Sequence, residues 1–344
     1  MHDISDADRA VSRWLKLCLV LVFSMVILGG VTRLTGSGLS MVTWHPTGML
    51  PPLGNAQWLE EFNLYQQFPE FQKINRDMTL EGFKQIFWFE YSHRMLGRLI
   101  GLVFLLPFIY FWLRKMLKPG LTPRLIVMFL LGGFQGLLGW YMVKSGLVSN
   151  PHVSQYRLSA HLLSAILIYG FILWTIFNLA SADKYRRLVD SSVAVWRKVS
   201  LGLVTLLLVT IVSGGFVAGL KAGIIFNTFP LMGGNLIPEG IGALSPWYLN
   251  PLENMVTVQF NHRWLAIGTG ILLIVWYIRG RSRFDEPLLQ RSFKLVGMMV
   301  IVQLLLGIAT LLMQVPVLLG VLHQAGALLL FSVLLFNIHA LSRV

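Results

Sequence analysis

The segment FEYSHRMLGR, residues 89–98, returns in altered form as VQFNHRWLAI, residues 258–267. Both segments contain a His-Arg pair, at 93–94 and at 262–263, and an apolar run follows each of them. Further matches between the two parts of the chain occur on either side of these pairs. The sequence therefore predicts that a helical unit has been duplicated within the chain.

The remaining matches keep the same order in the two halves of the chain. They are Gly29-Gly30 with Gly214-Gly215, Gln135 and Gly139 with Gln303 and Gly307, and His161 with His323. The glycine pairs lie further apart along the chain than the His-Arg pairs do, so the first outer loop is longer in the first half. An even number of helices separates the matches, which predicts two units of the same orientation, residues 1–190 and 191–344.

Composition places both units in a membrane. The chain has 344 residues, of which 55% are hydrophobic and 12% are charged. Apolar runs of about 20 residues can cross a bilayer as helices, and these runs lack the alternation of barrel strands. The sequence therefore predicts an all-α polytopic membrane protein with eight transmembrane helices as two tandem four-helix bundles. The predicted spans are 14–32, 92–113, 122–143, 158–180, 199–220, 260–279, 293–313 and 318–340.

Membrane orientation explains the formal net charge of +13. Lysine and arginine gather before the first apolar run and in every second connection, for example at Lys118, Lys198 and Arg283. By the positive-inside rule these segments and both termini are cytoplasmic, and nucleic acid is not expected as a partner. The first run lacks the cleavage pattern of a signal peptide, which predicts a retained helix in the inner or plasma membrane of the cell.

One histidine lies near the start of each even-numbered predicted helix: His93, His161, His262 and His323. These helices start at the outer face in the predicted topology, so the four histidines share one level. A single membrane histidine most often hydrogen-bonds a neighbouring helix, but two pairs at matching positions favour axial ligation of one haem in each half. Zinc would need three or four close ligands, and copper would favour cysteine or methionine nearby.

Four arginines lie close to these predicted sites: Arg33, Arg94, Arg98 and Arg263. Guanidinium groups recognise carboxylates in a bidentate manner, so these side chains are candidates for binding haem propionates. The alternative is that they extend to lipid phosphates at the membrane surface. The glycine pairs are expected to permit close helix packing.

The two halves differ at Glu90, whose counterpart at the matching position of the second half is Gln259. Glu90 precedes His93 by three positions, so on a continuous helix both side chains lie on one face. A carboxylate there could act as a catalytic general base or stabilise developing positive charge. The alternative is an acidic residue at the start of a helix, favoured by the helix dipole and paired with Arg94.

The chain resembles the haem A synthases of bacteria and mitochondria. The matching segments are GGVTRLTGSGLSMVTWHPTGMLPPL (29–53), FEYSHRMLGR (89–98), RLSAHLLSA (157–165), FNHRWLA (260–266) and LHQAGALLL (322–330). The resemblance implies an oxidoreductase that oxidises a ring methyl of haem O to a formyl group, giving haem A for cytochrome oxidase biogenesis. It also implies that Glu90, His93 and His161 form the site of the substrate haem, and that His262 and His323 hold a b-type cofactor haem.

This sequence departs from some bacterial members, which carry cysteine pairs in outer loops. Its only cysteine is Cys18 in the first apolar run, so it resembles the cysteine-free branch. The family's reaction takes the methyl group to an alcohol and then to a gem-diol that loses water. The apolar tail of haem O implies access from the lipid, and a haem O synthase and an electron-transfer protein are expected partners.

Two other classes of function fit part of the sequence. A non-catalytic di-haem b-type cytochrome, passing electrons to or from quinone, would explain the histidine pairs and the duplication but not the Glu90/Gln259 difference. A transporter built from two repeats would predict polar or broken helices at the bilayer midplane, where the runs are mostly uninterrupted. The pigment of the purified protein distinguishes the three classes.

Overall fold

The computed structural model describes residues 6–44, 50–148, 151–180 and 191–343. Within these ranges the regular structure is helical, apart from one isolated bridge between Met232 and Asn235. The long helices are α1 (Asp6–Leu34), α4 (Leu80–Leu113), α5 (Leu121–Gly146), α6 (Gln155–Ala180), α7 (Ser191–Gly219), α9 (Met255–Arg283), α10 (Pro287–Leu312) and α11 (Val317–Leu341). The short ones are α2 (Asn55–Gln66), α3 (Pro69–Lys73), α8 (Asn250–Glu253), η1 (Ala222–Ile224) and η2 (Trp247–Leu249).

Seven helices in the described part of the chain are long and apolar enough to cross a membrane: α1, α4, α5, α6, α7, α10 and α11. The prediction of an all-helical, multi-pass integral membrane protein is therefore confirmed. The predicted span at 260–279 falls on α9, which is not among the seven. The polar residues at 261–263 and the arginines near its C-terminal end reduce its apolar character. Its 29 residues nevertheless correspond to about 43 Å of helix.

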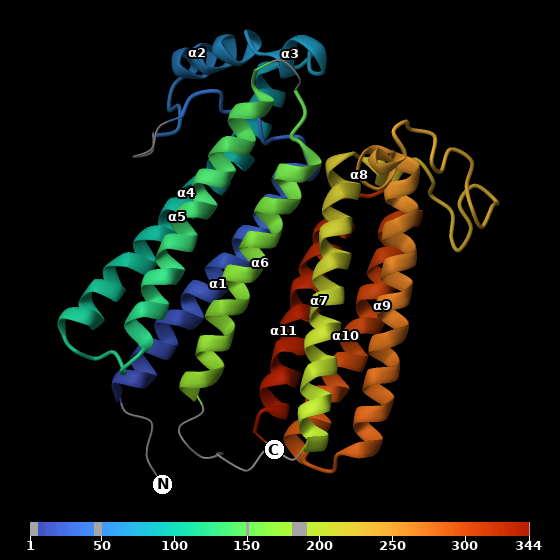
Figure 1. Ribbon diagram of the computed structural model, residues 1–344. Coiled ribbons are helices and arrows are strands. Elements are labelled where there is room, and N and C mark those ends of the chain that lie inside the picture. The colour runs from blue at the N-terminus through green and yellow to red at the C-terminus, as the bar shows by residue number, and fades with distance from the viewer. Residues whose placement is uncertain (1–5, 45–49, 149–150, 181–190, 344) are drawn as a thin grey trace.

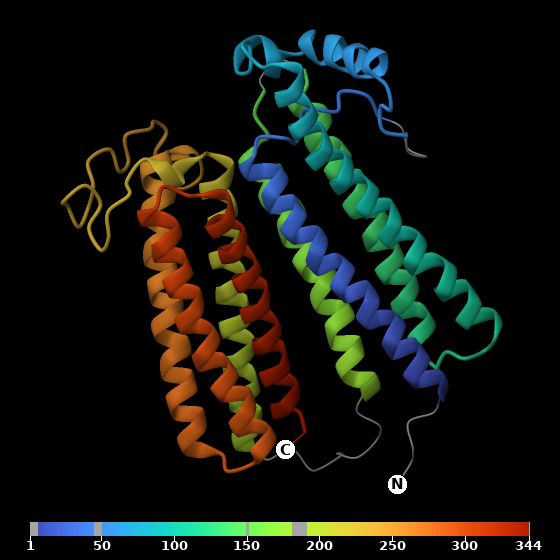
Figure 2. The same ribbon diagram turned by 180° about the vertical axis from the view of Figure 1, so that it is seen from behind.

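The long helices stand in two groups (Figures 1 and 2). Helices α1, α4, α5 and α6 form one group, and α7, α9, α10 and α11 form the other. The groups meet where α6 packs on α7 and α11, and where α1 packs on α11. Helix α1 begins and α11 ends at one end of the molecule, whereas α2 and α3 lie at the opposite end. The predicted boundary between residues 190 and 191 adjoins segment 181–190, which lies outside the described residues.

Glycines bring the two groups close together. A Cβ built on Gly30 of α1 would lie 2.8 Å from the Gln324 side chain of α11, closer than real side chains approach. On α7, a Cβ on Gly215 would lie 2.6 Å from Ser159 of α6. The expectation that the glycine pairs permit close helix packing is therefore confirmed.

Helix α4 begins earlier than the sequence predicted. Its N-cap is Thr79, whose hydroxyl accepts a hydrogen bond from the Gly82 amide at 3.2 Å. Because α4 starts at Leu80, Glu90 lies in the body of the helix, and its interpretation as an acidic residue at a helix start is wrong. The extra turns form because Phe83 and Phe87 are fully buried beneath α2.

Helices α2 and α3 lie between α1 and α4 in the chain, and α2 packs on the start of α4. Trp58, Phe62 and Tyr65 pack on the first turns of α4. Glu70 of α3 is buried there, and the Tyr65 hydroxyl donates to its carboxylate at 3.2 Å. Burial raises the pKa of Glu70 to about 7. These contacts hold the segment that carries α2 and α3 over the N-terminal end of α4, about three turns before Glu90.

Candidate functional site

In both groups, the histidine of the His-Arg pair stands opposite a glycine of a neighbouring helix. His93 of α4 faces Gly29 of α1, and a Cβ built on Gly29 would lie 3.2 Å from His93 Cε1. His262 of α9 faces Gly214 of α7, with a corresponding distance of 3.0 Å. The two contacts occupy matching positions of the predicted duplication, so the repeat extends to the surroundings of the side chains.

The other two histidines repeat a second contact. His161 of α6 faces Gly139 of α5, where an added Cβ would lie 3.0 Å from His161 Cε1. His323 of α11 faces Gly307 of α10, with a distance of 2.9 Å. Each imidazole therefore occupies the space that a side chain on the facing helix would otherwise fill.

Two glutamines hold these histidine-bearing turns in place. Gln135 of α5 donates from Nε2 to the carbonyl of His161 at 2.9 Å, and Gln303 of α10 donates to the carbonyl of His323 at the same distance. The sequence matches included both glutamines without giving them a role. Gln135 lies one helical turn before Gly139, and Gln303 lies one turn before Gly307. This shared spacing could have indicated that the glutamines contact the same histidine-bearing helices as the glycines.

The histidines form two pairs. His93 and His161 are near enough to interact electrostatically, and so are His262 and His323. Among the described residues, no three histidine, cysteine or acidic side chains gather as a metal ion's ligand set would. Two imidazoles on facing helices, each set against a glycine, fit a haem with two axial nitrogen ligands and do not fit a zinc site.

The Glu90 side chain lies between α4 and the segment 40–43, which follows α1. It is 3% exposed, and its Oε2 accepts hydrogen bonds from Ser40 Oγ and the Met41 amide, each at 2.8 Å. Its Oε1 forms an ion pair with Arg94 Nη2 at 2.5 Å. The carboxylate is therefore fixed in position by three donors, one of which is charged.

Gln259 has the opposite hydrogen-bonding role at the matching position. Its Nε2 donates to the carbonyl of Phe226 at 3.0 Å, whereas Glu90 accepts from the amide of Met41, the residue that matches Phe226. The Gln259 Oε1 atom is buried without a hydrogen-bond partner in the described part of the chain. The replacement of Glu90 by Gln259 at the matching position thus removes a negative charge. It also makes the side chain the donor of the buried hydrogen bond to the loop instead of the acceptor.

Arg94 and Arg263 each bind the backbone of the segment that follows the first long helix of their own half. Arg94 donates from Nη1 and Nη2 to the carbonyls of Thr43 and Met41, at 2.8 and 2.7 Å. Arg263 makes the matching bonds to Thr228 and Phe226, at 2.6 and 2.5 Å. Both arginines therefore fix the chain that follows the first helix of their half.

The other two predicted arginines lie elsewhere. Arg33 donates from Nη2 to the carbonyls of Ala218 and Gly219, at 2.5 and 3.1 Å, at the C-terminal end of α7. Its guanidinium therefore caps a helix of the other group. Arg98 lies one turn beyond Arg94 on α4, where its Nη1 is 3.7 Å from Met95 Sδ.

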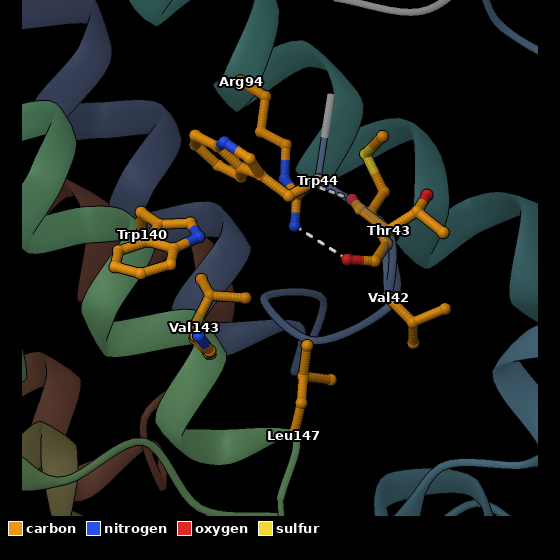
Figure 3. A pocket seen from close by; sticks show the side chains of 9 residues that line it. Val42, Thr43, Trp44, Arg94, Trp140, Val143 and Leu147 are labelled. Atoms are coloured by element: carbon orange, nitrogen blue, oxygen red, sulfur yellow. Dashed lines mark hydrogen bonds between the residues drawn. The ribbon is translucent and has the colours of Figure 1, made fainter. Parts of the chain in front are cut away.

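A cavity of about 290 Å³ opens beside Arg94, between α4, α5 and the segment 41–44. Figure 3 shows Arg94 on α4, Trp140 and Val143 on α5, and Thr43 on the segment beside Arg94. The guanidinium of Arg94 lies 5.4 Å from the Trp44 ring centroid, and Lys144 Nζ lies 4.8 Å from that of Trp140. The charge of Arg94 is paired with Glu90, so Lys144 is the cation of the cavity wall whose charge is available to a bound group.

Trp140 and Lys144 were not among the residues predicted from the sequence to form the site. A single lysine at the outer end of a span gives little signal by itself. The signal that could have identified it is the comparison of the halves, because the matching positions of the second half hold Ile308 and Leu312. The part of the cavity wall that Trp140 and Lys144 form is therefore a feature of the first half.

These contacts define a polytopic helical membrane protein with two histidine pairs, each in a repeated setting of facing glycine, anchoring glutamine and loop-binding arginine. The family model described as "Cytochrome oxidase assembly protein" matches residues 12–335. The protein named "Heme A synthase" of Nitrosospira multiformis is 47% identical, covering 98% of this chain and 94% of its own length. The bovine (Bos taurus) protein named "Heme A synthase COX15" is 46% identical, covering 98% of this chain and 83% of its own. The chain belongs to the haem A synthase family.

Proposed function

We propose that this protein oxidises a ring methyl group of haem O to a formyl group and so supplies haem A for cytochrome oxidase assembly. The observation that carries the proposal is membership of the haem A synthase family over nearly the whole chain. The paired histidines against glycines provide a fitting place for haem in each half. A non-catalytic di-haem cytochrome would leave the buried difference between Glu90 and Gln259 unexplained.

We assign the substrate to the first half, residues 1–190, and the cofactor to the second, residues 191–344. His93 and His161 would hold haem O, and His262 and His323 would hold haem b. The cavity beside Arg94 supports this division because two of its lining residues, Trp140 and Lys144, correspond to the apolar Ile308 and Leu312 in the second half. When bound, haem b supplies a one-electron carrier beside the substrate site.

Glu90 is the proposed catalytic carboxylate of the first half. Ser40 and the Met41 amide hold its Oε2 and Arg94 holds its Oε1, so a carboxylate is kept in place on the same helix as His93. In this role Glu90 accepts the proton released as the methyl group is oxidised. Arg94 and Lys144 would bind a propionate, with Arg33, Arg98 and Arg263 as further candidates for the same interaction.

The proposed topology has eight spans in two bundles of the same orientation, with α9 as the eighth span and both termini in the cytoplasm. The packing of α9 against α7 and α10, two apolar helices, supports its place in the membrane. The supply of haem O by a haem O synthase and an electron-transfer partner are part of the same proposal. The lipid bilayer is the expected route for the apolar tail of the substrate.

Reporter fusions test the topology. Fusions after Lys118, Lys198 and Arg283 are expected to report the cytoplasm, because these connections carry the excess of lysine and arginine. Fusions near Pro151 and Gly240 should report the outer side. A reporter at Gly240 on the same side as one after Arg283 would show that α9 does not span, and an inverted pattern would reverse the proposed orientation.

Pigment extraction from the purified protein tests the function. We expect haem O or haem A together with protohaem, because the substrate and cofactor sites should both be filled in part. Protohaem alone would favour the cytochrome, and a pigment-free protein would favour a transporter. Reverse-phase chromatography with mass detection separates the three haems by their tail and formyl group.

A further inference from the structure

The two halves differ in the hydrogen bonding of the histidine in the His-Arg pair, which is His93 in the first half and His262 in the second. In the second half, Ser213 Oγ lies 2.8 Å from His262 Nδ1. The same hydroxyl donates to the carbonyl of Thr210, one turn earlier in α7, at 2.7 Å. A serine hydroxyl has only one hydrogen, so Ser213 must accept from His262. The Nδ1 atom therefore carries the ring proton, and Nε2 keeps the lone pair that a metal needs.

Among its described residues, the first half shows no bond of this kind at His93. The residue that matches Ser213 is Leu28, next to the Gly29 that faces His93. The Nδ1 atom of His93 is buried without a hydrogen-bond partner among the residues that the structure describes. Thr210, which anchors Ser213, likewise corresponds to the apolar Met25. The serine contact is thus an addition of the second half and not a part of the repeat.

We propose that Ser213 is a positioning residue that fixes His262 in the Nδ1–H tautomer and so holds Nε2 as a permanent axial ligand. The proposal rests on the assignment of haem b to His262 and His323. A hydrogen bond from Nδ1–H orients the ring and makes the ligating nitrogen more basic. The second half would then retain its haem through many turnovers. His93, without this bond, would hold a substrate that must leave as product.

The test compares Ser213→Ala with wild type in the purified holoprotein. Loss of an outer partner of a histidine ligand typically weakens metal binding 10–100-fold, so transfer of the b-type haem to excess apomyoglobin should be faster by a similar factor. A less basic ligand stabilises ferric iron less, so the midpoint potential should rise. A tenfold change in the ferric-over-ferrous preference corresponds to about 59 mV for one electron.

Two further variants make the result specific. Ser213→Thr keeps the hydroxyl, so its midpoint potential and its haem retention should both stay at the wild-type values. Leu28→Ala, at the matching position of the first half, should leave the b-type haem unchanged. Suppose that His262→Ala removes the b-type haem, but Ser213→Ala changes neither the midpoint potential nor the rate of haem transfer. That result would overturn the role of Ser213 and leave the ligand assignment standing. A b-type haem that survives His262→Ala would overturn the ligand assignment as well.

Discussion

Alanine in place of His262 or His323 is expected to strip the b-type haem from the purified protein. Each side chain is proposed to supply one of two axial nitrogens, and the two histidines lie near enough to interact with each other. Alanine in place of His93 or His161 should leave most of the b-type spectrum and abolish conversion of haem O. The measurements are the reduced-minus-oxidised spectrum for retention and chromatography of extracted haems for turnover.

His152 provides the matched control because it is an exposed histidine of an outer loop. Its replacement by alanine should change neither haem retention nor turnover, while removing an imidazole from the same side of the protein. The division of labour between the halves would be contradicted if all four helix histidine variants lost the same partial amount of haem. That result would indicate two equivalent sites in place of a substrate site and a cofactor site.

Glu90→Gln is expected to abolish most haem A formation while the protein still folds and binds haem. Loss of a general base typically slows a reaction by 10²–10⁴-fold, about 3–5 kcal/mol of barrier. The second half shows why folding should survive: Arg263 stands beside the uncharged Gln259 and donates from Nη1 and Nη2 to two loop carbonyls. Arg94 has the equivalent pair of carbonyls and would keep them. Haem O or its alcohol should accumulate in the extracted pigment.

The control for Glu90 is Ser40→Ala, which removes one donor to the carboxylate and leaves the charge in place. If Glu90 acts as the base, Ser40→Ala should cost far less activity than Glu90→Gln. If Glu90 only fastens the 40–43 segment to α4, the two variants should lose activity together and melt at similarly lowered temperatures. Haem A formation close to wild type in a folded Glu90→Gln protein would end the catalytic assignment.

Periodic and repeated features were predictable from the sequence. Seven of the eight predicted spans fall on helices that could cross a membrane. The matches between the halves included the four glycines that face the histidines, although the contacts themselves were not predicted. The pairing of Glu90 with Arg94 followed from their separation by one helical turn. These features depend on local sequence and on comparison within one chain.

Contacts between distant segments were not predictable. The sequence predicted too late a start for α4 because the first turns of this helix carry charged residues. These turns are held by the burial of Phe83 and Phe87 against aromatic side chains of α2, which lies apart in the sequence. The sequence made Arg33 a candidate for a haem propionate or a lipid phosphate, and its contact with the end of α7, in the other half of the chain, could not be read from the pattern. The contact of Ser213 with His262 likewise depends on how α7 lies against α9. Such partners are decided by packing, which a pattern along the chain does not encode.

The interface between the two groups of helices has the form of a two-fold symmetric dimer. Helix α6 packs on α7 as its counterpart α11 packs on α1, and α6 and α11 meet each other. Two copies of one subunit would make such self-complementary contacts, but they would also carry identical residues at both sites. Joining the copies in one polypeptide removes that constraint, because each copy can then mutate independently. Glu90 and Gln259 could therefore diverge, and one ancestral site could become two sites with different chemistry.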